Sequence, residues 1–335
     1  MQTYSRAQIT TGLVVGVVAV SSAAILIRFA IGDDAGVSEA APGHAAPLAV
    51  AFWRTVGGSL ALVPFAVRHQ RRAEAPLSRR DQGLLAASGA FLAAHFALWL
   101  WSLALTTVAS SVTLVTMSPI FVALGGWWFL GERTTRRTWI GMAVTIVGAI
   151  TIGFADAAAI DLGPRALAGD ALAFGGALAV TGYLLIGRLL RRRLHVTTYA
   201  SVVYGWAAAI LLVLCLSTGT DLWGYDGTVW LAIAGLIVGP QLLGHTVFNT
   251  LLSSVSATVV SIVVLAEPVG ATLLAWLLLD ELPAPLFWLG APLVLVGVAV
   301  ATARRRTATA RRPSGDQRAA DGTVDNVSAR EDGPR

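Results

Sequence analysis

The chain has no lysine, a single cysteine and few charged residues for its length. All 24 basic residues are arginine, a bias that we attribute to genome composition rather than to chemistry. The one cysteine, Cys215, lies inside an apolar run, which excludes a disulfide framework and a cysteine-based metal site. Charged residues make up 13% of the chain, whereas soluble domains carry about 25%. The composition therefore excludes an ordinary soluble domain.

Two further absences narrow the class of protein. The chain contains no nucleotide-binding P-loop, which excludes ATP as a driver that acts on this chain. It also lacks the alternating strands of about ten residues that outer-membrane barrels require. The net charge of +5 would suit a nucleic-acid partner, but the arginines stand beside apolar segments. Loop charges that set membrane orientation explain them better, so we expect no nucleic-acid partner.

Long apolar runs fill most of the chain. Apolar residues make up 56% of it, and the mean hydropathy is +0.70. Runs of about 20 residues are long enough to cross a bilayer core of roughly 30 Å. They predict an all-α polytopic membrane protein with ten transmembrane helices. These lie at residues 11–31, 48–67, 84–105, 109–130, 138–155, 168–187, 198–217, 229–251, 258–279 and 286–303.

Arginine and acidic residues divide the connections between these segments into two groups. The arginines follow the second, fourth, sixth and tenth segments: Arg68, Arg71, Arg72, Arg79, Arg80, Arg133, Arg136, Arg137, Arg188, Arg191, Arg192, Arg193, Arg304, Arg305, Arg306, Arg311 and Arg312. The opposite connections carry Asp33, Asp34, Glu39, Asp156, Asp161, Asp221 and Asp226, with Arg165 as the one basic exception. Because arginine-rich connections stay inside the cell, we expect a cytoplasmic (inner) membrane protein with both termini cytoplasmic.

The two halves of the chain repeat each other at an offset of 149 residues, which places Pro119 on Pro268. Nine further identities follow: Val115, Leu124, Trp127, Leu130, Glu132, Trp139, Gly141, Val147 and Gly148 match Val264, Leu273, Trp276, Leu279, Glu281, Trp288, Gly290, Val296 and Gly297. Each half holds five segments, an odd number, so the second copy crosses the membrane upside down. The sequence predicts two inverted five-helix repeats, a common scaffold of transporters.

This repeat predicts the domain organisation. We expect a cytoplasmic N-terminus at 1–10, a first repeat at 11–155, a second repeat at 168–303 and a disordered cytoplasmic tail at 304–335. The tail is expected to be disordered because it is rich in Arg, Asp, Gly, Ser and Pro and has almost no apolar residues. The long connection 32–47 is expected to be a partly ordered outer loop, with a role that the sequence leaves open.

Four stretches carry a family resemblance: AFWRTVGGSLAL, ASSVTLVTMSPIFVALGGWWFLGER, GDALAFGGALAVTGYLLIGRLL and GHTVFNTLLSSVSATVVSIVVLAEPVGATLLAWLLLDE. Their order, spacing and duplication over residues 12–303 resemble the EamA-type family of the drug/metabolite transporter superfamily. The resemblance implies ten helices around a central cavity and movement of small organic solutes, often outward. It does not fix the substrate. The 32–47 insertion departs from the short loops of the family.

Two ionisable side chains stand at membrane depth, where charge is costly and marks function by default. Glu267, beside Pro268, is interpreted either as a carrier of a coupled proton, as a partner for a cationic solute, or as a neutral side chain bonded to freed backbone. Arg54 is interpreted as a contact for a carboxylate or phosphate of the substrate, as a partner of Glu267, or as a residue that snorkels outward. Arg28 is expected to snorkel.

Pro119 and Pro268 occupy matching positions in the middle of the fourth and ninth segments. Proline removes a helical hydrogen bond and kinks the helix. Paired interruptions in two halves are typical of a midplane site or a hinge, so we assign both prolines a gating or kink role. A static kink that serves packing is the alternative.

Polar residues recur along two other segments. Gln241, His245 and Asn249 repeat every four residues, and His95 with Trp99 stands near the middle of the third segment. A stripe that faces a wet cavity explains this pattern, and hydrogen bonding between helices is the alternative. Two histidines without a carboxylate cluster predict no metal site, and the sequence predicts no cofactor.

The leading hypothesis is a secondary transporter that exports small organic metabolites or drugs by alternating access, with protons as a possible coupling ion. The partners are then a small organic solute and the lipid bilayer, and a homodimer is left open. An intramembrane enzyme is the first rival, but its nucleophile, base and metal ligands would have to cluster near one membrane face. A channel-like facilitator is the second rival.

Overall fold

The computed structural model describes residues 4–32, 42–71, 76–106, 108–153 and 163–303, and within these ranges it is helical without strands. The helices are α1 (Arg6–Ser21), α2 (Ala23–Ile31), α3 (Pro47–Arg71), α4 (Arg79–Leu105), α5 (Val108–Val115), α6 (Ser118–Leu130), α7 (Arg136–Gly153), α8 (Pro164–Arg191), α9 (Val196–Ser217), α10 (Gly227–Leu236), the π-helix η2 (Ile237–His245), α11 (Thr246–Leu251), α12 (Ala257–Val264), α13 (Glu267–Leu279) and α14 (Phe287–Thr302).

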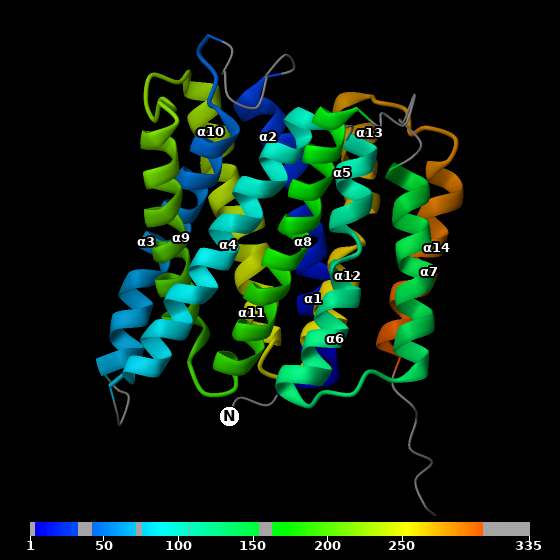
Figure 1. Cartoon of the computed structure of the whole chain (residues 1–335), viewed down its shortest axis with the longest axis horizontal. Coiled ribbons are helices and arrows are strands. Elements are labelled where there is room, and N and C mark those ends of the chain that lie inside the picture. Colours follow the sequence, from blue (N-terminus) through cyan, green and yellow to red (C-terminus); the bar gives the residue numbers. More distant parts are fainter. Residues whose placement is uncertain (1–3, 33–41, 72–75, 107, 154–162, 304–335) are drawn as a thin grey trace, which may run out of the picture. The chain divides into compact units, whose positions relative to one another are not determined.

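These helices form the ten membrane passes that the apolar runs predict. Passes one, four, eight and nine are each built from consecutive pieces: α1–α2, α5–α6, α10–η2–α11 and α12–α13. Eight passes are apolar stretches of 18 residues or more, and the shorter α14 and the arginine-flanked α7 complete the ten. Successive passes alternate in direction (Figure 1).

The bundle has two ends, which we name by their residues. The arginine-rich face holds the end of α3, the start of α4, the end of α6, the start of α7 and the end of α8 (Figure 1). The opposite face holds the ends of α2, α9 and α13. Polar caps fix the helix starts on the arginine-rich face: the Ser78 hydroxyl accepts from the Asp81 amide at 3.1 Å, and Ser5 forms a capping box with Gln8.

The inverted repeat is visible in the fourth and ninth passes. In both passes the helix is interrupted for two residues shortly before the matched proline. The second piece then begins at Ser118 (α6) or at Glu267 (α13), 149 residues apart. The caps before these starts, Met117 and Ala266, have nearly the same backbone angles, with φ of −77° and −78°. Proline suits the first turn of a helix because its missing N–H has no partner there. The expected kinks are therefore breaks in the helix.

The two passes also end alike. The C-cap of α6 is Gly131 and that of α13 is Asp280, and both adopt the left-handed conformation, with φ of 66° and 56°. Glycine takes this conformation without a steric penalty, whereas Asp280 is the one non-glycine residue with positive φ among those described. Glu132 and Glu281 follow these caps. The matched caps confirm that the duplication extends to backbone detail.

Matched glycines join α7 to α14. A Cβ added to Gly148 would lie 2.6 Å from the Val294 nitrogen and 2.7 Å from the Gly290 oxygen, and a Cβ on Gly290 would lie 2.7 Å from the Gly148 oxygen. Gly141 and Gly297 approach each other in the same way. The two antiparallel helices therefore pack with backbone against backbone, as expected of small residues in membrane helix pairs.

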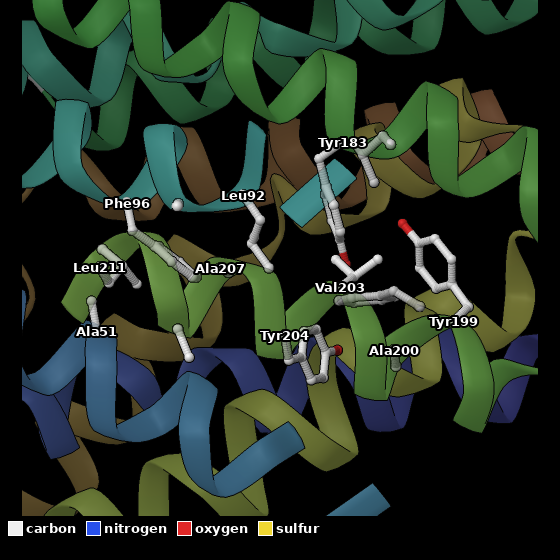
Figure 2. Close-up of a cluster of buried hydrophobic side chains, with 14 of the residues drawn as sticks. Ala51, Leu92, Phe96, Tyr183, Tyr199, Ala200, Val203, Tyr204, Ala207 and Leu211 are labelled. Carbon is white, nitrogen blue, oxygen red and sulfur yellow. The ribbon is translucent and has the colours of Figure 1, made fainter. Parts of the chain in front are cut away.

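The largest buried cluster lies mainly between α3, α4, α8 and α9, which pack extensively as the pairs α4–α8, α3–α9 and α4–α9. Figure 2 shows Leu92 and Phe96 of α4 facing Val203 and Ala207 of α9, with three tyrosines nearby. Cys215 is fully buried at the end of α9, as its apolar setting predicts. This cluster holds the helices that carry the polar residues discussed below.

Several expectations fall on residues outside the described ranges. They include the disordered tail at 304–335, most of the 32–47 outer loop, and the acidic residues Asp33, Asp34, Glu39, Asp156 and Asp161. The expected domain boundaries remain predictions.

Candidate functional site

Arg54 on α3 is the centre of a buried polar cluster. Its side chain is buried, its Nε donates to the Oε1 of Gln241 at 3.0 Å, and its guanidinium carbon lies 4.9 Å from the centre of the Phe96 ring. The ring covers the guanidinium as a cation–π partner. Arg54 thus points into the bundle rather than snorkelling outward, which removes the third of its three interpretations.

Two donors of this cluster have no hydrogen-bond partner. Arg54 Nη2 and Gln241 Nε2 are both buried and unbonded. The ion pairs among the described residues join Arg28 to Glu281, Arg188 and Arg192 to Glu132, and Arg193 to Asp81. Arg54 therefore has no carboxylate of the described chain within 4.0 Å, and it forms no salt bridge with Glu267.

Glu267, His95 and His245 surround Arg54 at longer range. Each of the three interacts electrostatically with the guanidinium. Unlike Arg54 and Gln241, these three side chains are partly exposed. The His245 ring meets Phe96 edge-on at 6.2 Å, and the His95 ring lies parallel to Trp99 at 6.3 Å. Four of the other six predicted binding or coupling residues thus gather around Arg54, and Trp99 stacks on one of them.

Glu267 begins α13 at the break in the ninth pass. A carboxylate in the first turn of a helix is stabilised by the helix dipole. Its backbone oxygen accepts from the Ser21 hydroxyl at 3.2 Å, which ties the break to α1. No hydrogen bond of its carboxyl group was found within the described chain, so the interpretation of Glu267 as a side chain bonded to freed backbone has no support.

The eighth pass contains a π-helix that the sequence did not predict. Residues Ile237–His245 form η2, and the Thr246 amide and hydroxyl both reach the Gln241 oxygen five residues back, the hydroxyl at 3.0 Å. Pro240 lies inside η2 and cannot donate a helical hydrogen bond. Such wide turns occur often at functional sites. Here the wide turn carries Gln241 and His245, the two members of the stripe nearest Arg54.

Asn249 has a different role from the rest of the stripe. Its Oδ1 accepts from the Tyr183 hydroxyl at 2.9 Å, and its Nδ2 donates to the Tyr204 oxygen at 3.2 Å. Tyr204 in turn lies 3.1 Å from the Thr246 hydroxyl. The side chain is therefore occupied by bonds between helices, and its predicted contact with a solute is untested.

Tyr204 and Phe96 were missed as members of the site. Both are buried, and both touch or interact with its central residues. Their positions in the middle of α9 and α4 were available from the sequence, but tyrosine is common at membrane interfaces and phenylalanine in cores. Trp53 of α3 donates to the Leu222 oxygen at 2.9 Å and contacts Trp223 and Trp230.

The serines of α4 serve packing. Ser88 lies 2.8 Å from the Tyr199 hydroxyl and Ser102 lies 2.6 Å from the Ser111 hydroxyl, all buried. These serines therefore form hydrogen bonds between helices.

Two sets of ion pairs link the repeats at opposite faces. At the arginine-rich face, Glu132 of the first repeat accepts from Arg188 Nε of the second at 2.7 Å and also pairs with Arg192. At the opposite face, Glu281 of the second repeat pairs with Arg28 of the first. Arg28 was expected to snorkel toward this face, and its half-exposed side chain forms the ion pair there. Each matched glutamate thus forms an ion pair with an arginine of the other repeat, one at each face.

Metal ligation finds no support in the described part of the chain, where no three His, Cys, Asp or Glu side chains gather in a suitable group. A surface hollow of about 250 Å³ is lined by Leu124, Trp127, Arg133 and Trp139, among others. It lies where α6 and α7 meet the arginine-rich face and contains none of the candidate residues.

Comparisons with known proteins agree with this architecture. The model of the EamA-like transporter family matches residues 11–154 and 167–303, so the chain belongs to this family. It is 25% identical to the uncharacterized transporter YwfM of Bacillus subtilis over 79% of this chain and 88% of the relative. It is 27% identical to the pseudopaline exporter CntI of Pseudomonas aeruginosa over 71% of this chain and 79% of the relative.

A solved crystal structure shares the fold. It aligns with a TM-score of 0.72 and 19% sequence identity over 89% of this chain and 97% of its own. The family and the relatives point to a multi-pass membrane transporter rather than an enzyme. A transporter of this family implies a small solute and a lipid environment.

Proposed function

We propose that the chain is a secondary transporter that exports small organic metabolites or drugs across the cytoplasmic membrane by alternating access. The observation that carries the proposal is the buried cluster around Arg54, to which the broken eighth and ninth passes contribute Gln241, His245 and Glu267. Polar groups at membrane depth face substrate paths, and discontinuous helices mark the binding sites of such transporters. The exporter CntI supports the outward direction.

The arginine-rich face is the cytoplasmic side in this proposal. Arginine-rich connections stay in the cytoplasm, and the described ends of α3, α6 and α8 supply them. The first helix, α1, begins on the same side (Figure 1), so the proposal places its start at the cytoplasmic face. Ten passes return the chain to the side where it began.

The crossed ion pairs support alternating access. With Glu132 paired to Arg188 and Glu281 paired to Arg28, contacts between the repeats are made at both faces. Opening toward one side then requires only the pairs of that side to break. The buried state of Arg54 and Gln241 fits a conformation that is closed at both ends.

Glu267 is the proposed proton carrier. It is the acid nearest Arg54 in the electrostatic sense, it stands at a helix break, and its repeat counterpart is the uncharged Ser118. A single protonatable carboxyl in the path lets one proton exchange for one solute. The absence of a salt bridge to Arg54 leaves this carboxyl able to change its protonation state.

Reconstituted protein tests the function. A counterflow screen of amino acids, nucleosides, amines and drugs in liposomes should find a solute that exchanges with saturation. Non-saturable flux would instead identify a channel-like facilitator, and a chemically changed solute would identify an enzyme. Light scattering of the purified protein decides the open question of a homodimer.

A variant separates coupling from exchange. Glu267→Gln should keep counterflow and lose the accumulation that a pH gradient drives, because the amide cannot release a proton. Asp226→Asn, an exposed acid at the start of α10, is the matched control and should keep both. Unchanged gradient-driven transport in Glu267→Gln would refute the coupling role.

A further inference from the structure

The donors left open beside Arg54 identify the chemistry of a ligand. We propose that the transported solute carries a carboxylate, and that Arg54 Nη2 and Gln241 Nε2 bind its oxygens. That the bound carboxylate is also transported rests on the proposed function. The binding site itself rests only on the contacts of Arg54 and Gln241.

The first argument is the geometry of the two donors. The bond from Arg54 Nε to Gln241 Oε1, 3.0 Å long, fixes the amide against the guanidinium. Arg54 Nη2 is bonded to the same guanidinium carbon as Nε, and Gln241 Nε2 to the same amide carbon as Oε1. The two open donors therefore belong to two groups that one hydrogen bond holds together. Both are buried and without a partner, which costs about 1–3 kcal/mol per group when no acceptor arrives.

The buried positive charge of Arg54 also favours an anionic ligand. Arginine stays charged in proteins, and a buried charge needs a counter-ion. The described chain places no carboxylate within 4.0 Å of Arg54. A water molecule would satisfy a donor but leave the charge unbalanced. An acceptor that also brings one negative charge satisfies both requirements.

The third argument selects a carboxylate over a phosphate. The Phe96 ring covers a face of the guanidinium at 4.9 Å, which leaves its edge for a planar partner. Arg54 supplies one positive charge, and Glu267 interacts with it electrostatically. A carboxylate monoanion balances Arg54 when Glu267 carries its proton, whereas a phosphate dianion would leave excess negative charge next to Glu267.

Thermal unfolding of the purified protein in detergent is the test. The probes are carboxylates paired with their primary amides: benzoate with benzamide, succinate with succinamide, and leucine with leucinamide, together with inorganic phosphate. A ligand that binds the folded protein raises the unfolding temperature with its concentration. We expect at least one carboxylate to stabilise the protein while its amide and phosphate do not.

Three variants locate the effect. Arg54→Lys keeps the charge but loses the planar fork, and should weaken the carboxylate response by about 10- to 150-fold. Gln241→Glu places a carboxylate of the chain itself at the guanidinium, and should leave a folded protein that no longer responds. The exposed Arg165→Lys is the control for the arginine-to-lysine change and should respond like the parent.

The inference falls if no carboxylate stabilises the protein, if amides or phosphate act equally well, or if Arg54→Lys and Gln241→Glu keep the parent's response. Counterflow decides the proposed function separately. A carboxylate that binds without exchanging would refute transport and keep the site. Exchange of a solute without a carboxylate, unaffected by Arg54→Lys, would refute the site and keep transport.

Discussion

The substitution Glu132→Gln should open the transporter at the arginine-rich face, which we propose to be the cytoplasmic side. Glu132 and Arg188 lie 2.7 Å apart, with only 19% and 14% of their side chains exposed, and Arg188 Nη1 also donates to the Leu252 oxygen at 2.5 Å. Breaking a charged hydrogen bond in such a setting costs about 1–3 kcal/mol. That cost shifts an equilibrium between closed and open states by about 5- to 150-fold.

Cysteine labelling measures this shift. Ser88 is fully buried in the half of α4 that is closer to the arginine-rich face, and its hydroxyl lies 2.8 Å from that of Tyr199. Ser88→Cys in a Cys215→Ala background therefore reports access from the cytoplasm. In inside-out vesicles, a membrane-impermeant maleimide should label Ser88→Cys about 5- to 150-fold faster when Glu132→Gln is added.

The repeat supplies the control for this experiment. Glu281 and Arg28 are 46% and 48% exposed, and exposed pairs contribute only about 0.2–1 kcal/mol. Glu281→Gln acts at the other face, so it should leave labelling from the cytoplasm unchanged or slower. Equal labelling with and without Glu132→Gln, in protein with an unchanged unfolding temperature, would refute the role of this pair in closure. Faster labelling in Glu281→Gln would refute the assignment of the two faces.

Two further predictions concern stability in detergent. Gly148→Ala should lower the free energy of unfolding by about 1–3 kcal/mol, because its Cβ would lie 2.6 Å from α14. Gly83→Ala is the control and should not destabilise the protein, since nothing lies within 4 Å of its Cβ. Equal unfolding temperatures of the two variants would contradict the packing argument. Burial, then His69 and Arg191, lowers the pKa of His195, which stacks on His69 at 3.6 Å. The unfolded chain therefore binds a proton that folded His195 resists, so stability should fall as the pH drops through about 6.5. His195→Gln should flatten this part of the pH profile of the unfolding temperature, and an unchanged profile would exclude His195 as the cause.

The scaffold was predictable because its rules are local. Pass number follows from apolar length, and the inverted arrangement follows from an odd number of passes per repeat. The offset that aligns Pro119 with Pro268 also aligned the helix breaks and the left-handed caps, down to Asp280 in place of Gly131. Proline restricts the backbone, and glycine permits conformations that other residues avoid. Because both effects are local, the recurrence of these residues carries structural information without knowledge of the neighbours.

The sequence predicted most residues of the cluster around Arg54, but it did not predict their contacts. Residue type and depth selected Arg54, Glu267 and Gln241, because polar groups at membrane depth are rare. A spacing of four could not separate Gln241, which bonds the guanidinium, from Asn249, which two tyrosines occupy. Nor does periodicity reveal a π-helix. These distinctions depend on neighbours from other passes.

The symmetry of the fold explains where function can reside. Elements that the repeats share, the breaks, the caps and the glutamates of the crossed pairs, provide equivalent contacts at the two faces, which alternating access requires. A solute site needs the opposite property. At the offset of 149 residues, Arg54 corresponds to Val203, Gln241 to Leu92 and Glu267 to Ser118. One copy of each charged or amide group therefore stands against an apolar or uncharged counterpart. A symmetric pair of such sites would bring two cations and two acids into one buried space, at a cost that burial would not repay. We infer that divergence of the two copies at these three positions gave the scaffold a single, oriented site.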